Sequence, residues 1–169
     1  MRIPSLIALL LLLCGGAACG KEIGDSCIIS SDCSPNGDRL CLEPQDKGGY
    51  CTVQGCDVDT CPDEAVCVRF FTGGFSNKLC VRETEDSSGP EHTDDCSFDE
   101  LCSLSGTCVP RSSEIRFCMR KCGSSDDCRD EYECRDLALM QAHGGEPVLG
   151  ADVPLDAKAQ KFCAAAPDE

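Results

Sequence analysis

The chain has 169 residues, of which 30 are acidic and 15 basic, and its formal net charge is −15. This charge excludes the basic face that binding to nucleic-acid phosphates requires. From residue 19 onward, Ile, Leu, Val and Phe make up only about 18% of the residues, a composition that by itself predicts disorder. The 18 cysteines reverse that expectation, because such a density is typical of a disulfide scaffold in an oxidising compartment.

The first residues predict a secretory signal peptide over 1–18. Arg2 is followed by an apolar run from Leu6 to Leu13 and by small residues at 15–18. The sequence GAAC at 16–19 resembles a bacterial lipobox, in which Cys19 becomes the lipidated first residue. Cleavage by an ordinary signal peptidase, giving a freely secreted product, is the alternative. We expect a lipid-anchored protein of the bacterial outer membrane or cell surface, and otherwise a secreted one, with residues 19–26 as an N-terminal tether.

The count of cysteines bears on this choice. If Cys14 leaves with the signal and Cys19 carries lipid, sixteen cysteines remain, and all of them can pair. Cleavage after Cys19 leaves the same sixteen, so parity excludes only a free Cys19.

The sixteen remaining cysteines fall into four successive groups of four. In each group the first two gaps are nearly constant and the third varies, as a surface loop would, which predicts an array of small modules. Asp and Ser before the second cysteine predict a turn. The third and fourth cysteines are expected on two short strands, with Tyr50, Phe117 and Phe162 as a minimal core. The groups are Cys27, Cys33, Cys41, Cys51; Cys56, Cys61, Cys67, Cys80; Cys96, Cys102, Cys108, Cys118; and Cys122, Cys128, Cys134, Cys163.

Short spacers between groups predict two eight-cysteine domains, 27–82 and 96–163. Residues 83–95 are acidic and contain Ser-Ser-Gly-Pro, which is typical of a linker. We expect all eight disulfides to lie within the domains and leave their connectivity open. The second domain carries a loop insertion at 135–162 and is followed by a tail at 164–169.

Within the insertion we expect a helix from Leu137 to His143, with Asp136 as its N-cap and Gly144-Gly145 as its end. A second helix could run from Pro154 to Lys161. The apolar residues of this insertion fit a loop with its own packing or a recognition loop.

Runs such as CIISSDCSPNGDRLCLEPQDKGGYC and CGSSDDCRDEYEC resemble cysteine-rich modules of the EB and Dickkopf N-terminal type, as in exported bacterial (myxobacterial-type) cysteine-rich lipoproteins. The resemblance covers most of residues 25–135. It implies a small disulfide-bonded fold. Together with the repeat and the insertion, the sequence predicts a small disulfide-rich fold of tandem modules, with short β-hairpins and turns, little regular secondary structure and one or two short helices in 136–161. The resemblance also implies a binding role without catalysis.

Motifs of hydrolases and nucleotide-binding enzymes are absent from the sequence, and no C-x-x-C pair offers a zinc or redox site. We therefore expect no catalytic residue, no metal site and no cofactor. The expected function is non-enzymatic binding or shielding at the cell surface. The partner is an unknown extracellular protein or surface ligand, and the membrane is contacted through the N-terminal lipid.

Two other functions remain open. A protease inhibitor would use the loop 68–79, where Arg69, Phe70, Phe71 and Phe75 could be exposed. A calcium-dependent adhesive module would use carboxylate clusters, although none matches an EF-hand. The clusters are Asp57, Asp59, Asp63, Glu64; Asp94, Asp95, Asp99, Glu100; and Asp126, Asp127, Asp130, Glu131.

Overall fold

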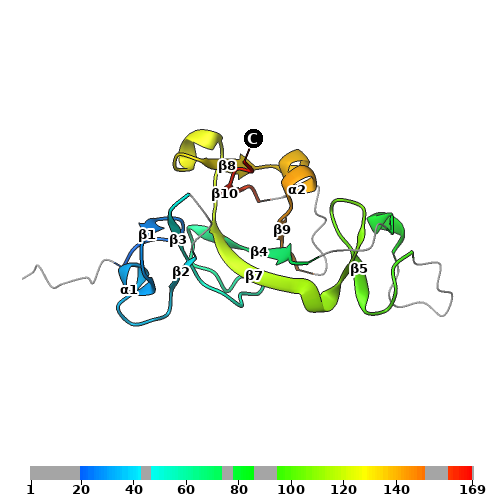
Figure 1. The fold of residues 1–169 in the computed structure, drawn as a ribbon, viewed down its shortest axis with the longest axis horizontal. Helices are drawn as coiled ribbons and strands as arrows, with labels where there is room; N and C mark the ends of the chain where they lie inside the picture. The colour runs from blue at the N-terminus through cyan, green and yellow to red at the C-terminus, as the bar shows by residue number, and fades with distance from the viewer. Residues whose placement is uncertain (1–19, 43–46, 74–77, 86–94, 151–159, 169) are drawn as a thin grey trace, which may run out of the picture.

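The computed structural model describes residues 20–42, 47–73, 78–85, 95–150 and 160–168 (Figure 1). Short strands dominate, joined by turns, and the longest helix has seven residues. The fold is therefore the small disulfide-rich class that the cysteine density predicted. The strands are β1 (Ser26–Cys27), β2 (Leu40–Leu42), β3 (Gly49–Thr52), β4 (Ala65–Phe71), β5 (Glu100–Cys102), β6 (Cys108–Pro110), β7 (Glu114–Arg120), β8 (Tyr132–Arg135), β9 (Glu146–Pro147) and β10 (Phe162–Ala165). The helices are α1 (Ser30–Cys33) and α2 (Leu137–His143), with 3₁₀ turns at Arg82–Thr84, Arg111–Ser113 and Ser125–Asp127.

Eight disulfides join all sixteen cysteines that were expected to pair, and they follow one rule. In each module of four cysteines, the first bonds to the third and the second bonds to the fourth. The third and fourth cysteines face each other across an antiparallel strand pair. The modules are N-terminal (Cys27, Cys33, Cys41, Cys51), central (Cys56, Cys61, Cys67, Cys118), nested (Cys80, Cys96, Cys102, Cys108) and C-terminal (Cys122, Cys128, Cys134, Cys163).

The grouping of the middle eight cysteines by sequence order was wrong. The nested module is inserted between β4 and β7, the two strands that hold the third and fourth cysteines of the central module. The bonds Cys61–Cys118 and Cys80–Cys102 therefore join residues of 27–82 to residues of 96–163. The expectation that disulfides stay within two domains divided at 83–95 is wrong. The long gap from Cys80 to Cys96 lies inside the nested module, between its first and second cysteines.

The acidic residue before the second cysteine fixes a tight turn in two modules. In the N-terminal module, Asp32 Oδ2 accepts hydrogen bonds from the backbone N–H groups of Ile28 and Ile29, at 2.8 and 3.2 Å. In the C-terminal module, Asp127 Oδ2 accepts in the same way from Gly123 and Ser124, at 2.7 and 3.0 Å. These backbone hydrogen bonds lower the pKa of both Asp carboxyl groups, because they stabilise the charged form. The repeated acidic position therefore has a structural reason.

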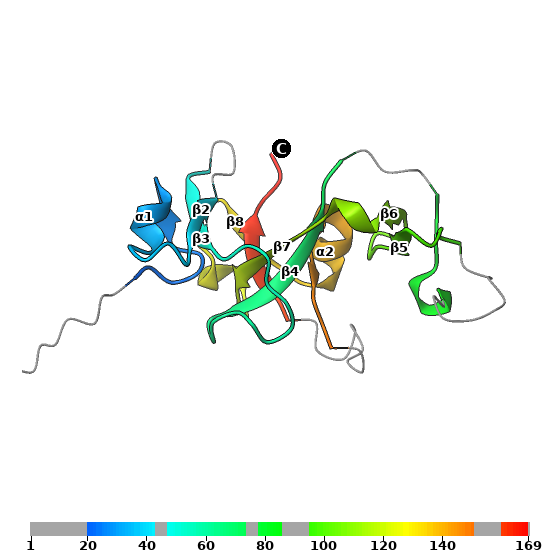
Figure 2. The ribbon, with the colours of Figure 1, turned by 90° about the horizontal axis from the view of Figure 1, so that it is seen from below.

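Two sheets face each other at the centre of the molecule. One has the strand order β7-β4-β9 and the other pairs β10 with β8. The N-terminal module adds its own sheet, β1-β3-β2, at one end, and the β5–β6 hairpin of the nested module lies at the opposite end of the long axis (Figures 1 and 2).

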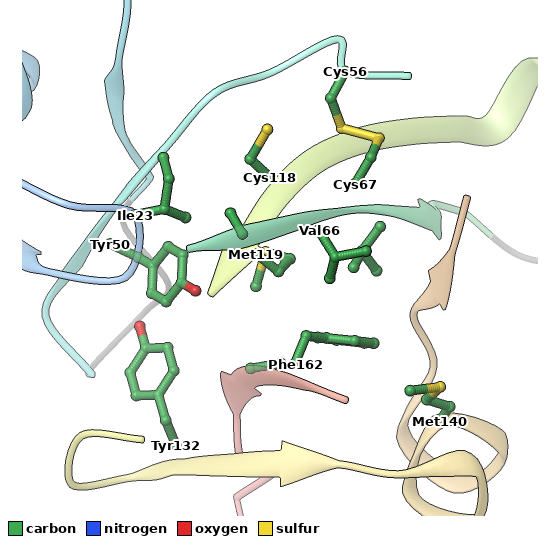
Figure 3. Close-up of a cluster of buried hydrophobic side chains, with 13 residues drawn as sticks. Ile23, Tyr50, Cys56, Val66, Cys67, Cys118, Met119, Tyr132, Met140 and Phe162 are labelled. Atoms are coloured by element: carbon green, nitrogen blue, oxygen red, sulfur yellow. A yellow bond between two sulfur atoms is a disulfide. The ribbon is translucent and has the colours of Figure 1, made fainter. Parts of the chain in front are cut away.

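Most of the main core lies in the space between the central sheets (Figure 3). Phe162 and Val68 are fully buried there, and Tyr50 is 2% exposed. Tyr50 and Phe162 were predicted as core residues, and both are confirmed; Phe117 packs against the same cluster and is partly buried. The core is larger than the low apolar content suggested, because it combines seven residues of the central module with two of the N-terminal and four of the C-terminal module. It consists of Ile23, Tyr50, Cys56, Ala65, Val66, Cys67, Val68, Cys118, Met119, Tyr132, Met140, Phe162 and Ala164.

Helix α2 has the boundaries that the sequence predicted. Asp136 is its N-cap and accepts a hydrogen bond from the N–H of Leu139 at 3.2 Å, and Gly144 ends it with φ +81°. The helix contributes Met140 to the core. The predicted second helix, Pro154 to Lys161, falls almost wholly outside the described residues.

Residues 20–26 are part of the folded N-terminal module, so the prediction that they form a tether was wrong. The side chain of Ile23 is fully buried in the main core. The N–H of Gly24 donates to the carbonyl of Cys51 at 2.9 Å, and Ser26 begins β1 opposite Tyr50. The folded part of the chain therefore begins no later than Gly20.

A buried carboxylate fastens the nested module to the rest of the molecule. Glu146 on β9 is 3% exposed and accepts hydrogen bonds from Arg69 on β4 and from Arg82, at 2.8 and 3.0 Å. It also accepts from the backbone N–H of Leu104, which lies between the nested strands β5 and β6. Two guanidinium groups and one N–H together compensate the burial of this charge.

Candidate functional site

The cysteines predicted as site residues have structural roles wherever the structure describes them. All sixteen paired cysteines are structural in the sense that they close the four modules. Cys19, the predicted lipidation site, lies outside the described residues. Within the described ranges, the only groups of three or more potential metal ligands are cysteines that are already disulfide-bonded.

Three of the carboxylates proposed as calcium ligands have other partners. Asp57 forms an ion pair with Arg116, with 2.9 Å between Oδ1 and Nη1. Glu64 lies 3.8 Å from Arg39, and Asp127 closes the turn before Cys128. Among the residues that the structure describes, these clusters do not converge on one point, and Asp94 lies outside that set.

The loop proposed as a protease-binding segment begins as a strand, since half of its described residues belong to β4. Arg69, Phe70 and Phe71 belong to β4 and are partly buried. Phe70 packs against Phe117 and Phe162, with ring centroids 6.3 Å apart in both pairs. Arg69 is held by Glu146, so the expectation that these three side chains are exposed was wrong. Phe75 lies outside the described residues.

An aromatic cavity of about 310 Å³ is the strongest candidate for a binding site. It lies where the two central sheets meet the N-terminal module, and its lining is mostly apolar. Concave, apolar sites with a few polar groups are the usual form of ligand pockets. The lining residues are Leu42, Tyr50, Phe70, Phe117, Met119, Tyr132, Arg135, Ala164 and Ala165.

The register of the strands explains why these side chains meet. Residues 117 and 119 of β7 are two apart and therefore point to the same face of the sheet. Cys118 between them points to the other face, toward its disulfide with Cys61. The disulfides thus occupy one face of this sheet and leave the opposite face to the rest of the main core and to the aromatic cavity.

Two stacked tyrosines form one wall of the aromatic cavity. The rings of Tyr50 and Tyr132 lie 5.4 Å apart at an interplanar angle of 15°. The hydroxyl of Tyr50 accepts from the N–H of Arg120 at 2.9 Å and donates to the carbonyl of Cys163 at 3.4 Å. Burial raises the pKa of Tyr50 to about 12 and raises that of Tyr132 as well. Both phenols are therefore neutral at physiological pH.

Two arginines hold this wall in place. The guanidinium of Arg129 lies 4.1 Å from the centroid of the Tyr132 ring and donates to the carbonyl of Gly49 at 2.7 Å. Arg135, on the cavity wall, donates to the carbonyls of His143, Gly144 and Ala165. Burial lowers the pKa of Arg135. The site can therefore take an apolar or aromatic group in a rigid, mostly uncharged pocket with one arginine in its wall.

The sequence indicated part of this site. The aromatic residues before the fourth cysteines identified Tyr50 and Phe117, and their repeated position was the usable signal. Tyr132 and Arg135 carried no comparable pattern, because they reach the cavity only through the folding of the C-terminal module over the N-terminal and central ones.

Among the described residues, no helix is both long and apolar enough to cross a membrane. The eight disulfides indicate an oxidising, extracytoplasmic environment, and the chain is an extracellular cysteine-rich protein. Comparison of the chain with protein-family models, curated proteins and solved structures finds no match.

Proposed function

We propose that this protein is a lipid-anchored, non-enzymatic binding protein of the bacterial cell surface, and that the aromatic cavity holds an apolar side chain of its partner. The observation that supports a binding role is the cavity itself. A chain with so few apolar residues leaves nine of its side chains around an unfilled apolar space of about 310 Å³.

The negative charge of the protein supports a partner of positive charge. Removal of residues 1–18, whose only charged residue is Arg2, changes the net charge from −15 to −16. A surface of one sign accelerates encounters with partners of the opposite sign. The proposed partner is therefore an extracellular protein of net positive charge that presents an aromatic or aliphatic side chain.

Support for the lipid anchor comes from the sequence alone. It rests on the segment GAAC at 16–19. The even number of cysteines that remains argues only against a free Cys19. The resemblance to EB and Dickkopf N-terminal modules supports a binding role in preference to catalysis.

The cavity can be tested with a neutral aromatic probe. Indole should bind the native protein and shift the NMR signals of the Ala164 and Ala165 methyl groups. Ala165→Leu adds a larger side chain to the lining and should weaken indole binding by about tenfold or more, since a filled cavity offers no apolar surface to the probe.

Ala138→Leu on the exposed face of α2 is the matched control, because it adds the same side chain away from the cavity. It should bind indole like the native protein. Equal loss of binding in both variants, or native binding in Ala165→Leu, contradicts the proposed site. The anchor is tested separately, because Cys19→Ser should move the protein from the membrane to the soluble fraction.

A further inference from the structure

The folded part of the chain reaches the residue next to the proposed lipidation site. A Cβ atom placed on Gly20 would lie 3.4 Å from the carbonyl oxygen of Cys33, so Gly20 lies against the last residue of α1. Consecutive Cα atoms are about 3.8 Å apart, and Cys19 is therefore no farther than that from a residue in contact with α1. A lipid on Cys19 would hold the N-terminal module directly at the membrane.

Two large apolar side chains are exposed at the other end of α1. Ile28 is 79% exposed and Ile29 is 57% exposed. Helix α1 is one turn long, from Ser30 to Cys33, and a helix rises about 1.5 Å per residue. Ile29, which precedes the helix, is therefore within roughly 10 Å of Gly20.

The turn that carries these isoleucines does not require apolar residues. The C-terminal module forms the same turn, with Gly123 and Ser124 donating to Asp127 as Ile28 and Ile29 donate to Asp32. The backbone hydrogen bonds account for the turn in both modules. The turn therefore does not explain why Ile28 and Ile29 are apolar.

Charges around this turn also fit contact with a lipid surface that lacks strong negative charge. Asp32 is occupied by the two N–H groups, and Glu22 and Asp25 both lie near Arg120, at 3.3 and 3.7 Å. The net charge of about −16 would repel a strongly anionic surface. Insertion must therefore depend on the acyl chains and on apolar side chains.

We infer that Ile28 and Ile29 insert into the interface of the membrane that holds the acyl chains of Cys19. The N-terminal module then lies on the bilayer, and the nested module, at the opposite end of the long axis, points away from it (Figures 1 and 2). This inference rests on the lipid anchor of the proposed function.

The chain has no tryptophan, so a single introduced tryptophan reports on its own surroundings. The lipoproteins with Ile28→Trp and with Phe98→Trp are purified from membranes and reconstituted into phosphatidylcholine vesicles with and without brominated acyl chains. Phe98 is 94% exposed and precedes β5 of the nested module, which makes it the matched control.

For Ile28→Trp we expect brominated lipid to lower the fluorescence about twofold or more, because an inserted indole contacts the acyl region. For Phe98→Trp we expect no change with brominated lipid. Intact mass establishes eight disulfides and the acyl groups on Cys19 in both variants, so folding and anchoring are checked in the same samples.

The outcomes distinguish failure of the lipid anchor from failure of the proposed insertion of Ile28 and Ile29. A protein without acyl groups refutes the anchor, and with it this inference. An acylated Ile28→Trp protein whose fluorescence is unchanged by brominated lipid, or is quenched no more than Phe98→Trp, overturns the inference and leaves the anchor intact. A blue shift that depends on protein concentration and not on lipid would assign Ile28 and Ile29 to contact between copies of the chain, which also overturns it.

Discussion

At the scale of single residues, Tyr50 joins three modules. It lies on β3 of the N-terminal module, and its hydroxyl bonds to the backbone of Arg120 on β7 and of Cys163 on β10. Its ring also stacks on Tyr132. Ionisation of this hydroxyl would remove the donor for Cys163 and place a charge in the core, which is why burial raises its pKa to about 12.

A pH titration tests this position, because the chain contains only two tyrosines and no tryptophan. In the native protein, near-ultraviolet absorbance should show less tyrosinate at about pH 10 than two free phenols would give, since burial raises both pKa values. A folded-state pKa above the unfolded value contributes stability that is complete below about pH 10. For Tyr50 that contribution is lost as the pH rises toward about 12.

The reduced protein in denaturant is the reference for this titration, and both tyrosines should titrate there near pH 10. Tyr132→Phe leaves Tyr50 as the only tyrosine and should give a single transition at high pH. A native transition near pH 10 in that variant would contradict the buried, hydrogen-bonded state of Tyr50.

At the scale of elements, the nested module behaves as an insertion into the β4–β7 hairpin. Its own core consists of its cysteines, and it contributes only the partly buried Leu104 to the main core. Strands β4 and β7 are already paired as far as Phe71 opposite Glu114, and Thr72 bonds to Ser113 beyond that pair. The hairpin does not need the insertion to fix its register.

We expect replacement of residues 73–112 by Asn-Gly, a two-residue turn suited to such a hairpin, to leave a folded protein. The six disulfides of the other three modules should form, including Cys61–Cys118. Glu146 keeps Arg69 and loses its bonds to Arg82 and Leu104, so the free energy of unfolding should fall by about 1–3 kcal/mol. Peptide mapping and denaturant unfolding measure both results.

The double substitution Cys80→Ser and Cys102→Ser in the full chain is the companion variant. It removes one of the two disulfides of the nested module without shortening the chain, and the six disulfides of the other three modules should again be native. Scrambled pairing of Cys61 or Cys118 in either variant would show that the nested module is needed to form the central one.

At the scale of the whole molecule, cross-links replace much of the apolar burial that other folds use. Two of the three buried clusters consist only of cysteines, and the third contains thirteen residues, three of them cysteines. Ordering one residue costs about 1–2 kcal/mol, which so small a core does not offset over the whole chain. The native structure should therefore depend on its disulfides.

Full reduction at neutral pH should unfold the protein without denaturant. Amide dispersion should collapse in NMR spectra, and the hydrodynamic radius should increase. The increase should be larger at low salt, because the negative charges of the chain, about −16 in total, then repel one another with little screening. The same protein with its disulfides intact, in the same buffers, is the control. A reduced chain that stays compact and dispersed would mean that the main core is sufficient by itself.

The sequence by itself determined the features that depend on adjacent residues or on the number of cysteines. The cysteine density set the fold class, the turn residues marked the second cysteines, and Asp136 with Gly144-Gly145 set the limits of α2, because caps act on adjacent backbone groups. Tyr50, Phe117 and Phe162 were also identifiable from their place before a cysteine. The expected anchor at Cys19 stays a prediction.

Only the tertiary structure decided which four cysteines form each module. Spacing cannot distinguish Cys80 as the last cysteine of one unit from Cys80 as the first of the next, since a pair is defined by distance in space. Strand pairing between β4 and β7 brings Cys118 next to Cys67 and leaves Cys80 to the nested module. The aromatic cavity arises for the same reason, because its walls come from strands up to about 120 residues apart and exist only when those strands pack together.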